Sequence, residues 1–410
     1  MSKTCGIDWS ERHHDVAIVD EDAGVVGRAR VGDDAAGFGR LLELLAEHTD
    51  DGEPSSVEIA IESDKGLFVA ALVAAGFTVF AINPRAVARY RERYGQAGGK
   101  SDPGDAALLA NIVRTDRHVH RALPADTDQA RAVKAAARQH QEAIWARQQA
   151  MNRLRSLLRE YYPHALQAFP NLAHRTAAVV LCAAPTPQAA ARLTPGRVVT
   201  LLKRAGRRND EGLAEQISAT LRADALRQPT AVEHALGVAA VGLLKVITAT
   251  SDAITALQTE LSAIFDQHTQ AKVLTSMPGL GPVLSARVLG ELGDDPHRFT
   301  DARAVRSFAG TAPITRASGR SRVVSSRRIC NRRLGDACHW WAFAALTKSP
   351  GARAHYDRRR AAGDSHNAAL RNLANKLLGK LWHCLQHDVC YHEASAWPEL
   401  TDTTAETAAA

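Results

Sequence analysis

The sequence lacks the features that mark secreted and membrane proteins. Its six cysteines are scattered without the spacing of a disulfide framework, which is typical of reduced thiols. The first residues hold no apolar signal core, because Asp8 and Glu11 follow almost at once. No window approaches the ~18 uncharged apolar residues of a transmembrane helix. We therefore expect a cytoplasmic protein that has no membrane partner.

The composition excludes wholesale disorder, and the length argues against a single domain. Of the 410 residues, 45% are hydrophobic and 23% are charged, as in globular proteins. A chain of this length is expected to form two or three domains, because single cores rarely grow beyond ~250–300 residues.

Acidic residues are scarce in one part of the chain. The whole sequence has 51 Lys and Arg against 44 Asp and Glu, a net charge of +7. Residues 301–380 alone have 17 basic and 4 acidic residues, a local net charge of +13. A solvated mixed-charge surface would carry comparable numbers of both signs. The block therefore indicates a polyanionic partner, and nucleic acid in particular.

Strand and helix signals alternate in the first 120 residues. Apolar runs predict strands at 4–7, 16–19, 25–31, 57–61 and 77–82, and helical stripes fall at 37–48, 66–75, 86–94 and 105–115. Three strands, then helix, strand, helix, strand and helices, is an RNase H-like order. We expect residues 1–124 to form an α/β domain of this kind, with helices on both sides of a mixed sheet.

The rest of the chain is predicted to be helical. Two long amphipathic helices, at 126–162 and 230–268, favour a coiled-coil-like pair, so residues 125–270 are interpreted as a spacer and oligomerisation region. Residues 271–395 are expected to form a mostly α domain that contains the basic block. Residues 396–410 have low complexity and are expected to form a disordered tail.

Four carboxylates stand at predicted strand ends and at a helix start in the N-terminal domain. Asp8 and Glu62 end two strands, and Asp102 and Asp105 lie in the segment KSDPGDA before a helix. Carboxylates that converge above a sheet suit one or two Mg²⁺ or Mn²⁺ ions, the geometry of phosphodiester chemistry. An N-cap or turn role is the alternative for the helix-start pair. Lys100, beside that pair, is a candidate phosphate contact.

Three segments of the N-terminal domain resemble a known family. They are GIDWSERHHDVAIVD, IAIESDKGLF and FAINPRAVARYRERYGQAGGKSDPGDAALLA. They look like the DEDD-type insertion-sequence transposases, also called bridge-RNA-guided recombinases, and the resemblance extends over nearly the whole chain. The family's RNase H-like domain carries an Asp-Glu-Asp-Asp tetrad, which falls on Asp8, Glu62, Asp102 and Asp105 by motif position. Asp64 is a nearby competitor for the assignment of Glu62.

A glycine-rich turn opens the C-terminal module. LTSMPGLGPVLSARVLGELGD, at 274–294, has the pattern of a helix-hairpin-helix, in which Gly279 and Gly281 would let backbone N–H groups approach a phosphate. An ordinary turn between packed helices is the alternative. Such an element contacts the nucleic-acid backbone and does not select sequence.

A serine lies among arginines in FAGTAPITRASGRSRVVSSRRICNRRL, at 308–334. By resemblance to the same family, whose C-terminal domain has A-G-x-x-P, then Ser-Gly, then a basic helix, Ser318 is the residue that attacks DNA and forms a covalent phosphoserine. Guanidinium groups could hold the scissile phosphate and stabilise the charge that develops during transfer. Taken alone, a Ser-Gly pair in a basic loop is more typical of a turn. The candidate phosphate-binding arginines are Arg316, Arg320, Arg322, Arg327, Arg328, Arg332 and Arg333.

Two further groups of residues carry weaker signals. Histidines and cysteines crowd residues 383–392 without a Cys-x-x-Cys pair, so a helix with buried cysteines is favoured over a metal site. Trp340, Trp341 and Phe343 could stack bases, but their helical spacing favours a place in the core.

Four functions are compatible with these patterns. The favoured one is a DNA recombinase that uses the carboxylates, a metal ion and Ser318, and works as a dimer or tetramer on element ends and target DNA. The family resemblance adds a structured guide RNA and a bacterial, nucleoid-associated location. The alternatives are an RNase H-like nuclease or junction resolvase without a covalent intermediate, and a nucleic-acid-binding protein without activity. An actin-like ATPase, suggested by Gly6-Ile7-Asp8, lacks the Gly-Thr phosphate loop that it would need.

Overall fold

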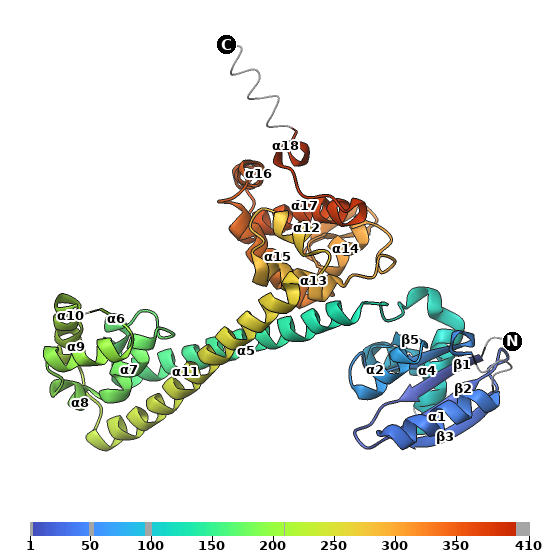
Figure 1. Cartoon of the computed structure of the whole chain (residues 1–410), viewed down its shortest axis with the longest axis horizontal. Helices are drawn as coiled ribbons and strands as arrows, with labels where there is room; N and C mark the ends of the chain where they lie inside the picture. The colour runs from blue at the N-terminus through green and yellow to red at the C-terminus, as the bar shows by residue number, and fades with distance from the viewer. Residues whose placement is uncertain (1–2, 49–52, 95–100, 209, 399–410) are drawn as a thin grey trace, which may run out of the picture. The chain divides into compact units, whose positions relative to one another are not determined.

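The computed structural model (Figure 1) describes residues 3–48, 53–94, 101–208 and 210–398. The chain divides into two compact units, Met1–Ala125 and Asp126–Ala410. The first is a mixed α/β unit built around one sheet, and the second is mostly helical. The predicted fold classes of the two parts are confirmed at this level.

The first unit is organised by a five-stranded sheet in the order β3-β2-β1-β4-β5. Its strands are β1 (Lys3–Asp8), β2 (His13–Val19), β3 (Val25–Gly32), β4 (Val57–Ile61) and β5 (Thr78–Ala81). The first three strands pair antiparallel, as successive hairpins allow, whereas β4 and β5 run parallel to β1. The carboxyl ends of β1, β4 and β5 therefore meet at one edge of the sheet.

Helices cover both faces of this sheet. They are α1 (Ala35–His48), α2 (Leu67–Ala74), α3 (Pro84–Tyr94) and α4 (Asp102–Asp116), with the short 3-10 helices η1 (Pro54–Ser56) and η2 (Arg117–Val119). One core joins the sheet to α1 and α2, and a second core joins it to α3 and α4. The prediction of a mixed sheet covered on both sides is confirmed.

A glycine sets the distance between α4 and β1. A Cβ atom at Gly6 would overlap the helix backbone at Ala106 and Ala110, so only glycine allows this approach. Because α4 lies so close to β1, its first turn reaches the end of the strand at Asp8. The glycine thereby helps to assemble the site described below.

Two long helices, α5 (Asp128–Tyr161) and α11 (Thr230–Asp266), pack together in the second unit (Figure 1). The Thr127 hydroxyl caps the start of α5 by accepting a hydrogen bond from the Ala130 amide. By length and composition α11 is the one described helix that could cross a membrane. A single helix of this kind is weak evidence for a membrane span, and its buried residues pack on protein at both ends.

The region interpreted as a spacer and oligomerisation region contains a hydrophobic core of its own. It holds α6 (Pro163–Ala168), α7 (Arg175–Ala183), α8 (Pro187–Ala191), α9 (Pro195–Arg204) and α10 (Glu211–Arg222). Their apolar residues form one core with the second half of α5 and the first half of α11. Four of these five helices begin with Pro or with a Thr or Asp cap, so the Pro-rich loops mark helix starts.

The C-terminal part of the second unit is a separate core at the other ends of α5 and α11. Its elements are α12 (Ala271–Ser276), α13 (Pro282–Leu292), α14 (Ala302–Phe308), β6 (Ile314–Ser318), β7 (Ser321–Ser325), α15 (Arg332–Ala345), α16 (Pro350–Ala361), α17 (His366–His387) and α18 (Glu393–Ala396). Trp397 packs into this core, and the predicted disorder of residues 399–410 lies outside the described residues.

The three aromatic residues of α15 do not share one environment, so their prediction as core is wrong for two of them. Trp341 is fully buried, and its indole N–H donates to the Pro278 carbonyl at 2.9 Å. Trp340 and Phe343 are exposed. Trp340 and Phe343 are three residues apart and so lie on nearly the same side of the helix. Trp341 follows Trp340 and points about 100° away from it.

Candidate active site

Asp8 and Glu62 lie side by side at the carboxyl edge of the sheet. Strands β1 and β4 are parallel, and the last paired residues of the ladder are Ile7 and Ile61. Each carboxylate is the next residue along its strand, so the register brings the two together. Both side chains are half-buried, so they are partly accessible to solvent at the end of the sheet.

The first turn of α4 adds the other two carboxylates. The Ser101 hydroxyl caps this helix by accepting from the Gly104 amide at 3.3 Å, so the N-cap role belongs to Ser101 and not to Asp102. Asp102 is exposed, whereas Asp105 is only 4% exposed. Its Oδ1 accepts from Nε and Nη2 of Arg91 at 2.9 and 2.7 Å. This ion pair fixes Asp105 from the side of α3.

The four residues, here called the carboxylate cluster, affect one another electrostatically. The pKa of Asp8 is raised to about 6, first by burial and then by repulsion from Glu62, Asp105 and Asp102. All four predicted tetrad members therefore lie close enough to interact. Asp64, the competitor for the glutamate position, is exposed and is not among the carboxylates that raise this pKa.

Sequence reasoning missed three residues of β2 and β3 beside the cluster. Asp15 pairs directly with Asp8 in the β1–β2 register and is 6% exposed. Arg30 donates to both of its oxygens, from Nε at 3.2 Å and from Nη2 at 2.9 Å. One ligand atom each of His13, Asp15 and Asp102 lies within 4.8 Å of the others. The sequence did hold a signal for His13 and Asp15: they lie two apart, just before the strand predicted at 16–19, so both point to one face of the sheet if that strand starts earlier.

The donor set at this edge fits a divalent cation. Oxygen-rich clusters are the sites that Mg²⁺ and Mn²⁺ prefer in proteins. The pKa of Asp8, raised first by burial and then by its acidic neighbours, favours a cation at this edge, although Arg91 neutralises Asp105 and Arg30 neutralises Asp15. Of the four cluster members, only Asp102 belongs to the group with ligand atoms gathered within 4.8 Å, so the carboxylate cluster would have to close around a cation, which would then offset the repulsion. Lys100, the predicted phosphate contact beside them, lies outside the described residues.

Asp8→Asn should stabilise the metal-free protein at pH 8, because it removes the charge that its neighbours repel. The group is partly solvated, so screening limits the gain to about 1 kcal/mol. The raised pKa means that the ionised form disfavours folding above pH 6, and this effect is lost as the pH falls toward 4. Thermal unfolding at the two pH values measures the difference.

A carboxylate of α4 outside the cluster provides the control for the thermal-unfolding measurement. Asp116, at the far end of α4, pairs with Arg93 at 3.2 Å, so Asp116→Asn should bring no gain. Adding Mg²⁺ should stabilise the wild type and should stabilise Asp8→Asn much less. A stability gain for Asp8→Asn that is equal at pH 8 and pH 4 would contradict the electrostatic account.

Ser318 lies at the tip of an exposed β-hairpin, whose two strands were not predicted, and the Ser-Gly pair stands at its turn. Strands β6 and β7 pair antiparallel through a two-residue turn, in which Gly319 has φ +54°. The register pairs Ser318 with Ser321 and Arg316 with Val323, and these four side chains share one face. Arg322 pairs with Ala317 on the opposite face, so Arg316 is the arginine that shares the serine's side.

The remaining predicted arginines follow this hairpin along the chain. Arg328 and Arg332 are exposed, and Arg327 is half-buried with an Nε atom that has no hydrogen-bond partner. Arg333, in the first turn of α15, is engaged by Glu142 and lies over the Trp145 ring at 5.0 Å. Arg333 is therefore the least available of the set to a phosphate.

The glycine-rich turn between α12 and α13 is packed against protein at one of its two glycines. A Cβ atom at Gly279, which has φ +83°, would lie 2.6 Å from the backbone nitrogen of Ala345 in α15. Packing against α15 thus accounts for this glycine. Gly281 is exposed, with open space around it, at the N-terminus of α13. A phosphate contact at this turn remains a prediction, and it depends on Gly281.

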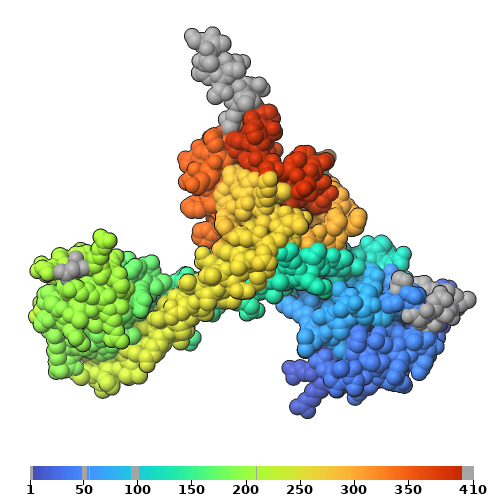
Figure 2. Space-filling model, viewed as in Figure 1, coloured from blue at the N-terminus to red at the C-terminus, as the bar shows by residue number. Residues whose placement is uncertain are grey.

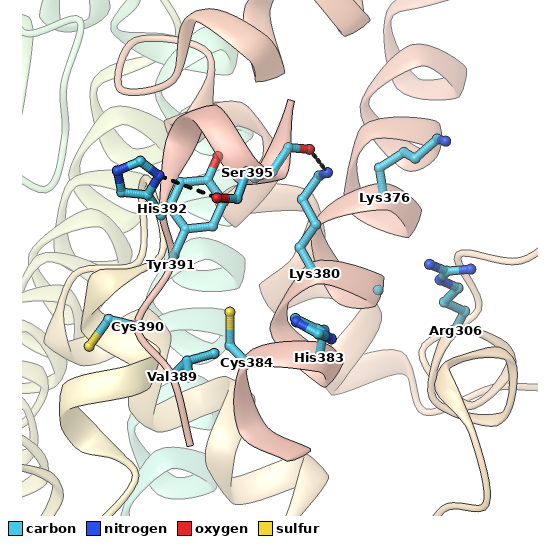
Figure 3. A pocket seen from close by; sticks show the side chains of 12 residues that line it. Arg306, Lys376, Lys380, His383, Cys384, Val389, Cys390, Tyr391, His392 and Ser395 are labelled. Carbon is cyan, nitrogen blue, oxygen red and sulfur yellow. Dashed lines mark hydrogen bonds between the residues drawn. The ribbon is translucent and has the colours of Figure 1, made fainter. Parts of the chain in front are cut away.

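Four of the histidines and cysteines near the C-terminus, His383, Cys384, Cys390 and His392, line a cavity of about 570 Å³ (Figure 3). The sulfur atoms of Cys384 and Cys390 point in different directions (Figure 3). Among the described residues, the only group of three or more His, Cys, Asp and Glu side chains with ligand atoms within 4.8 Å of one another is His13, Asp15 and Asp102, so no such group lies around this cavity. Lys380 points to the Ala396 carbonyl and stacks on Trp397, with its Nζ 4.1 Å from the ring centroid. Lys380 therefore has a structural role in this pocket.

Comparisons with known proteins identify related sequences. Residues 5–163 match a DEDD-type family model described as a transposase, and residues 271–357 match the transposase IS116/IS110/IS902 family. The chain is 51% identical to the IS117 mini-circle protein of Streptomyces coelicolor, which carries the name transposase, over 98% of both chains. It is 30% identical to the 42 kDa protein of insertion element IS900 from Mycobacterium paratuberculosis, over 95% of this chain and 97% of the other. It is 29% identical to the 44.8 kDa protein of IS116 from Streptomyces clavuligerus, over 97% of both.

Proposed function

This chain belongs to the transposase family of the insertion elements IS116, IS110 and IS902, and on that premise we propose that it cuts and rejoins DNA with the carboxylate cluster and Ser318. The observation that carries the proposal is the convergence of Glu62, Asp102 and Asp105 on Asp8. The substrates are the ends of an insertion element and a target DNA.

The carboxylate cluster is proposed as a Mg²⁺ or Mn²⁺ site of an RNase H-like domain. The strand order β3-β2-β1-β4-β5, with parallel strands added to an antiparallel triplet, supports this fold. A bound ion would polarise the scissile phosphate and offset the charge that develops on its oxygens. The protein's own part is to hold four oxygen ligands at one sheet edge, with Arg91 fixing Asp105.

Ser318 is proposed as the nucleophile. Its Oγ bonds to phosphorus as one P–O bond of the strand breaks, and the departing strand oxygen takes the proton to become a hydroxyl. Attack by another strand's hydroxyl then reverses the step and frees the serine, so rejoining requires no ATP. The exposed hairpin tip supports this role, because a DNA strand can reach it, and Arg316 on the same face can contact the phosphate.

Guidance by a structured RNA belongs to the same proposal and follows the family resemblance. Base pairing would then choose the DNA sites, while the protein contacts backbone and shape. The exposed arginines around the hairpin, and Gly281 at the start of α13, are the proposed backbone contacts. The protein would act in the bacterial cytoplasm and associate with the nucleoid when active.

Assembly into a dimer or tetramer is proposed because strand exchange between two duplexes involves four strands. An exposed apolar stripe on α11 supports it, and this helix forms part of the visible surface of its unit (Figure 2). The residues of this stripe are spaced alternately four and three apart, as in a coiled-coil seam. The stripe consists of Ala235, Ala239, Gly242, Val246, Ala249, Ala253 and Ala256.

Charged substitutions in this stripe of α11 should therefore dissociate the dimer or tetramer into single chains. Ala239→Glu combined with Val246→Glu should lower the mass measured by light scattering to that of one chain, because paired helices would bury the new carboxylates together. The fold should survive, since both residues are exposed in the single chain. Gln258→Glu, on another exposed side of α11, should leave the mass unchanged. An active double variant of wild-type mass would exclude the stripe as the interface.

An RNase H-like nuclease or junction resolvase remains the second candidate. The carboxylate cluster alone would suffice for it, with water in place of the serine. The two functions differ in the product, since only the recombinase leaves a strand attached to protein. Cleavage of labelled DNA in Mg²⁺, followed by denaturing electrophoresis, separates them.

A further inference from the structure

A row of exposed rings crosses the C-terminal domain on α15 and α17. Trp340 and Phe343 are 51% and 50% exposed, and their ring centroids lie 6.2 Å apart. Phe343 lies 6.4 Å from His366, at the start of α17. Neighbouring aromatic rings that remain half in water indicate a binding surface, because a ligand that covers them removes apolar area from solvent.

A cavity of about 310 Å³ adjoins this row at two points. His339 lines the cavity, and its ring centroid lies 5.7 Å from that of Trp340. Asn367, which follows His366 in the chain, lines it as well. The rings therefore lie beside the cavity, next to two of its lining residues, and its size is at the lower end of small-molecule sites.

The cavity carries positive charge. Arg332 and Arg371 line it and are exposed, and no Asp or Glu is found among its described lining residues. No ion pair engages either guanidinium within the described ranges, in contrast to Arg333 and its partner Glu142. Unpaired guanidinium groups bind phosphate oxygens with two parallel hydrogen bonds. The row of rings thus lies beside an anion-binding hollow.

We propose that this surface binds an unpaired nucleotide, with its base stacked on Trp340 or Phe343 and its phosphate held by Arg332 and Arg371. A base in a duplex has both faces covered by neighbouring pairs, whereas an unpaired base can stack on an exposed ring. The ligand is a single-stranded segment of RNA or of DNA, since both share this chemistry. Binding requires neither the carboxylate cluster nor Ser318, so it can be tested apart from recombination.

The test uses the full-length chain in EDTA, so that no strand is cut. Fluorescence anisotropy measures its affinity for RNA and DNA oligonucleotides of about 12 nucleotides, and for a duplex of the same sequence. Trp340→Ala combined with Phe343→Ala should weaken single-strand binding about tenfold or more, because the base loses the aromatic ring on which it stacks. Affinity for the duplex should change less than about twofold. Leu226→Ala, which removes an apolar side chain that is 99% exposed, should change neither.

Two further variants sharpen the assignment. Trp340→Phe keeps a ring and should retain most of the affinity, whereas Arg332→Gln with Arg371→Gln should weaken binding and reduce its salt dependence by about two phosphate contacts. A greater loss for RNA than for DNA assigns the surface to RNA, and an equal loss assigns it to any unpaired strand.

Three results would overturn the proposal. The first is wild-type single-strand affinity in the double aromatic variant, with its unfolding temperature unchanged. The second is an equal loss for the duplex, which would make the surface a general DNA contact. The third is a change in oligomer mass without a change in nucleic-acid affinity, which would identify a protein interface.

Discussion

Glu62→Gln should reduce strand cleavage at least ~1,000-fold while leaving the protein folded. The amide keeps the shape of the side chain but removes a charged oxygen ligand beside Asp8, so a divalent ion would be held poorly. The measurement is the rate of cleavage of labelled element-end DNA in Mg²⁺. Equal unfolding temperatures for the variant and the wild type show that the loss is chemical.

The neighbouring Asp64 offers a matched control for this substitution. It lies two residues away, is exposed, and does not contribute to the raised pKa of Asp8. Asp64→Asn should therefore cleave within about threefold of the wild type. If Asp64→Asn is inactive and Glu62→Gln is active, the glutamate of the tetrad is misassigned. If Asp105→Asn also recombines normally, the whole cluster is wrong as a catalytic site.

Ser318→Ala should eliminate the covalent protein–DNA adduct entirely, because no other atom of that side chain can bond to phosphorus. The hairpin provides a close control, since Ser321 pairs with Ser318 across the turn, on the same face, and is also exposed. Ser321→Ala should keep the adduct at near wild-type yield. Denaturing electrophoresis of reactions with labelled DNA measures both.

The two serine variants also distinguish a nucleophile from a binding residue. A residue that only contacts the phosphate would weaken DNA binding and leave some adduct at saturating DNA. Ser318→Ala should instead bind DNA normally and form no adduct at any DNA concentration. Adduct formation by Ser318→Ala, or its loss in Ser321→Ala alone, would transfer the role to another serine.

Much of the first unit could be predicted because its signals are local. Asp8 follows a short apolar run and Glu62 follows a β-branched one, and parallel strands place their carboxyl ends at one edge. Asp105 follows from its position in the first turn of a helix. The partnership of Asp15 with Arg30 could not be predicted, because it depends on the register between β2 and β3, which no local pattern specifies.

The second unit was harder to predict at its surface. The hairpin of Ser318 was missed because its strands are held by mutual pairing and not by a buried face, so no apolar alternation marks them. Trp340 and Phe343 were assigned to the core from their spacing alone. Only the packing of α15, which buries Trp341 against Pro278, shows that the other two rings face outward.

The most direct test of the account is to map the attachment site of DNA on the protein. Wild-type protein is incubated with element-end DNA in Mg²⁺, denatured, digested, and its DNA-linked peptide identified by mass spectrometry. The account predicts a phosphodiester bond between a DNA end and the Oγ of Ser318, formed in Mg²⁺ and absent in EDTA or in Glu62→Gln. Metal-dependent cleavage that leaves only free phosphate and hydroxyl ends, with no linked peptide, would contradict it and identify a nuclease instead.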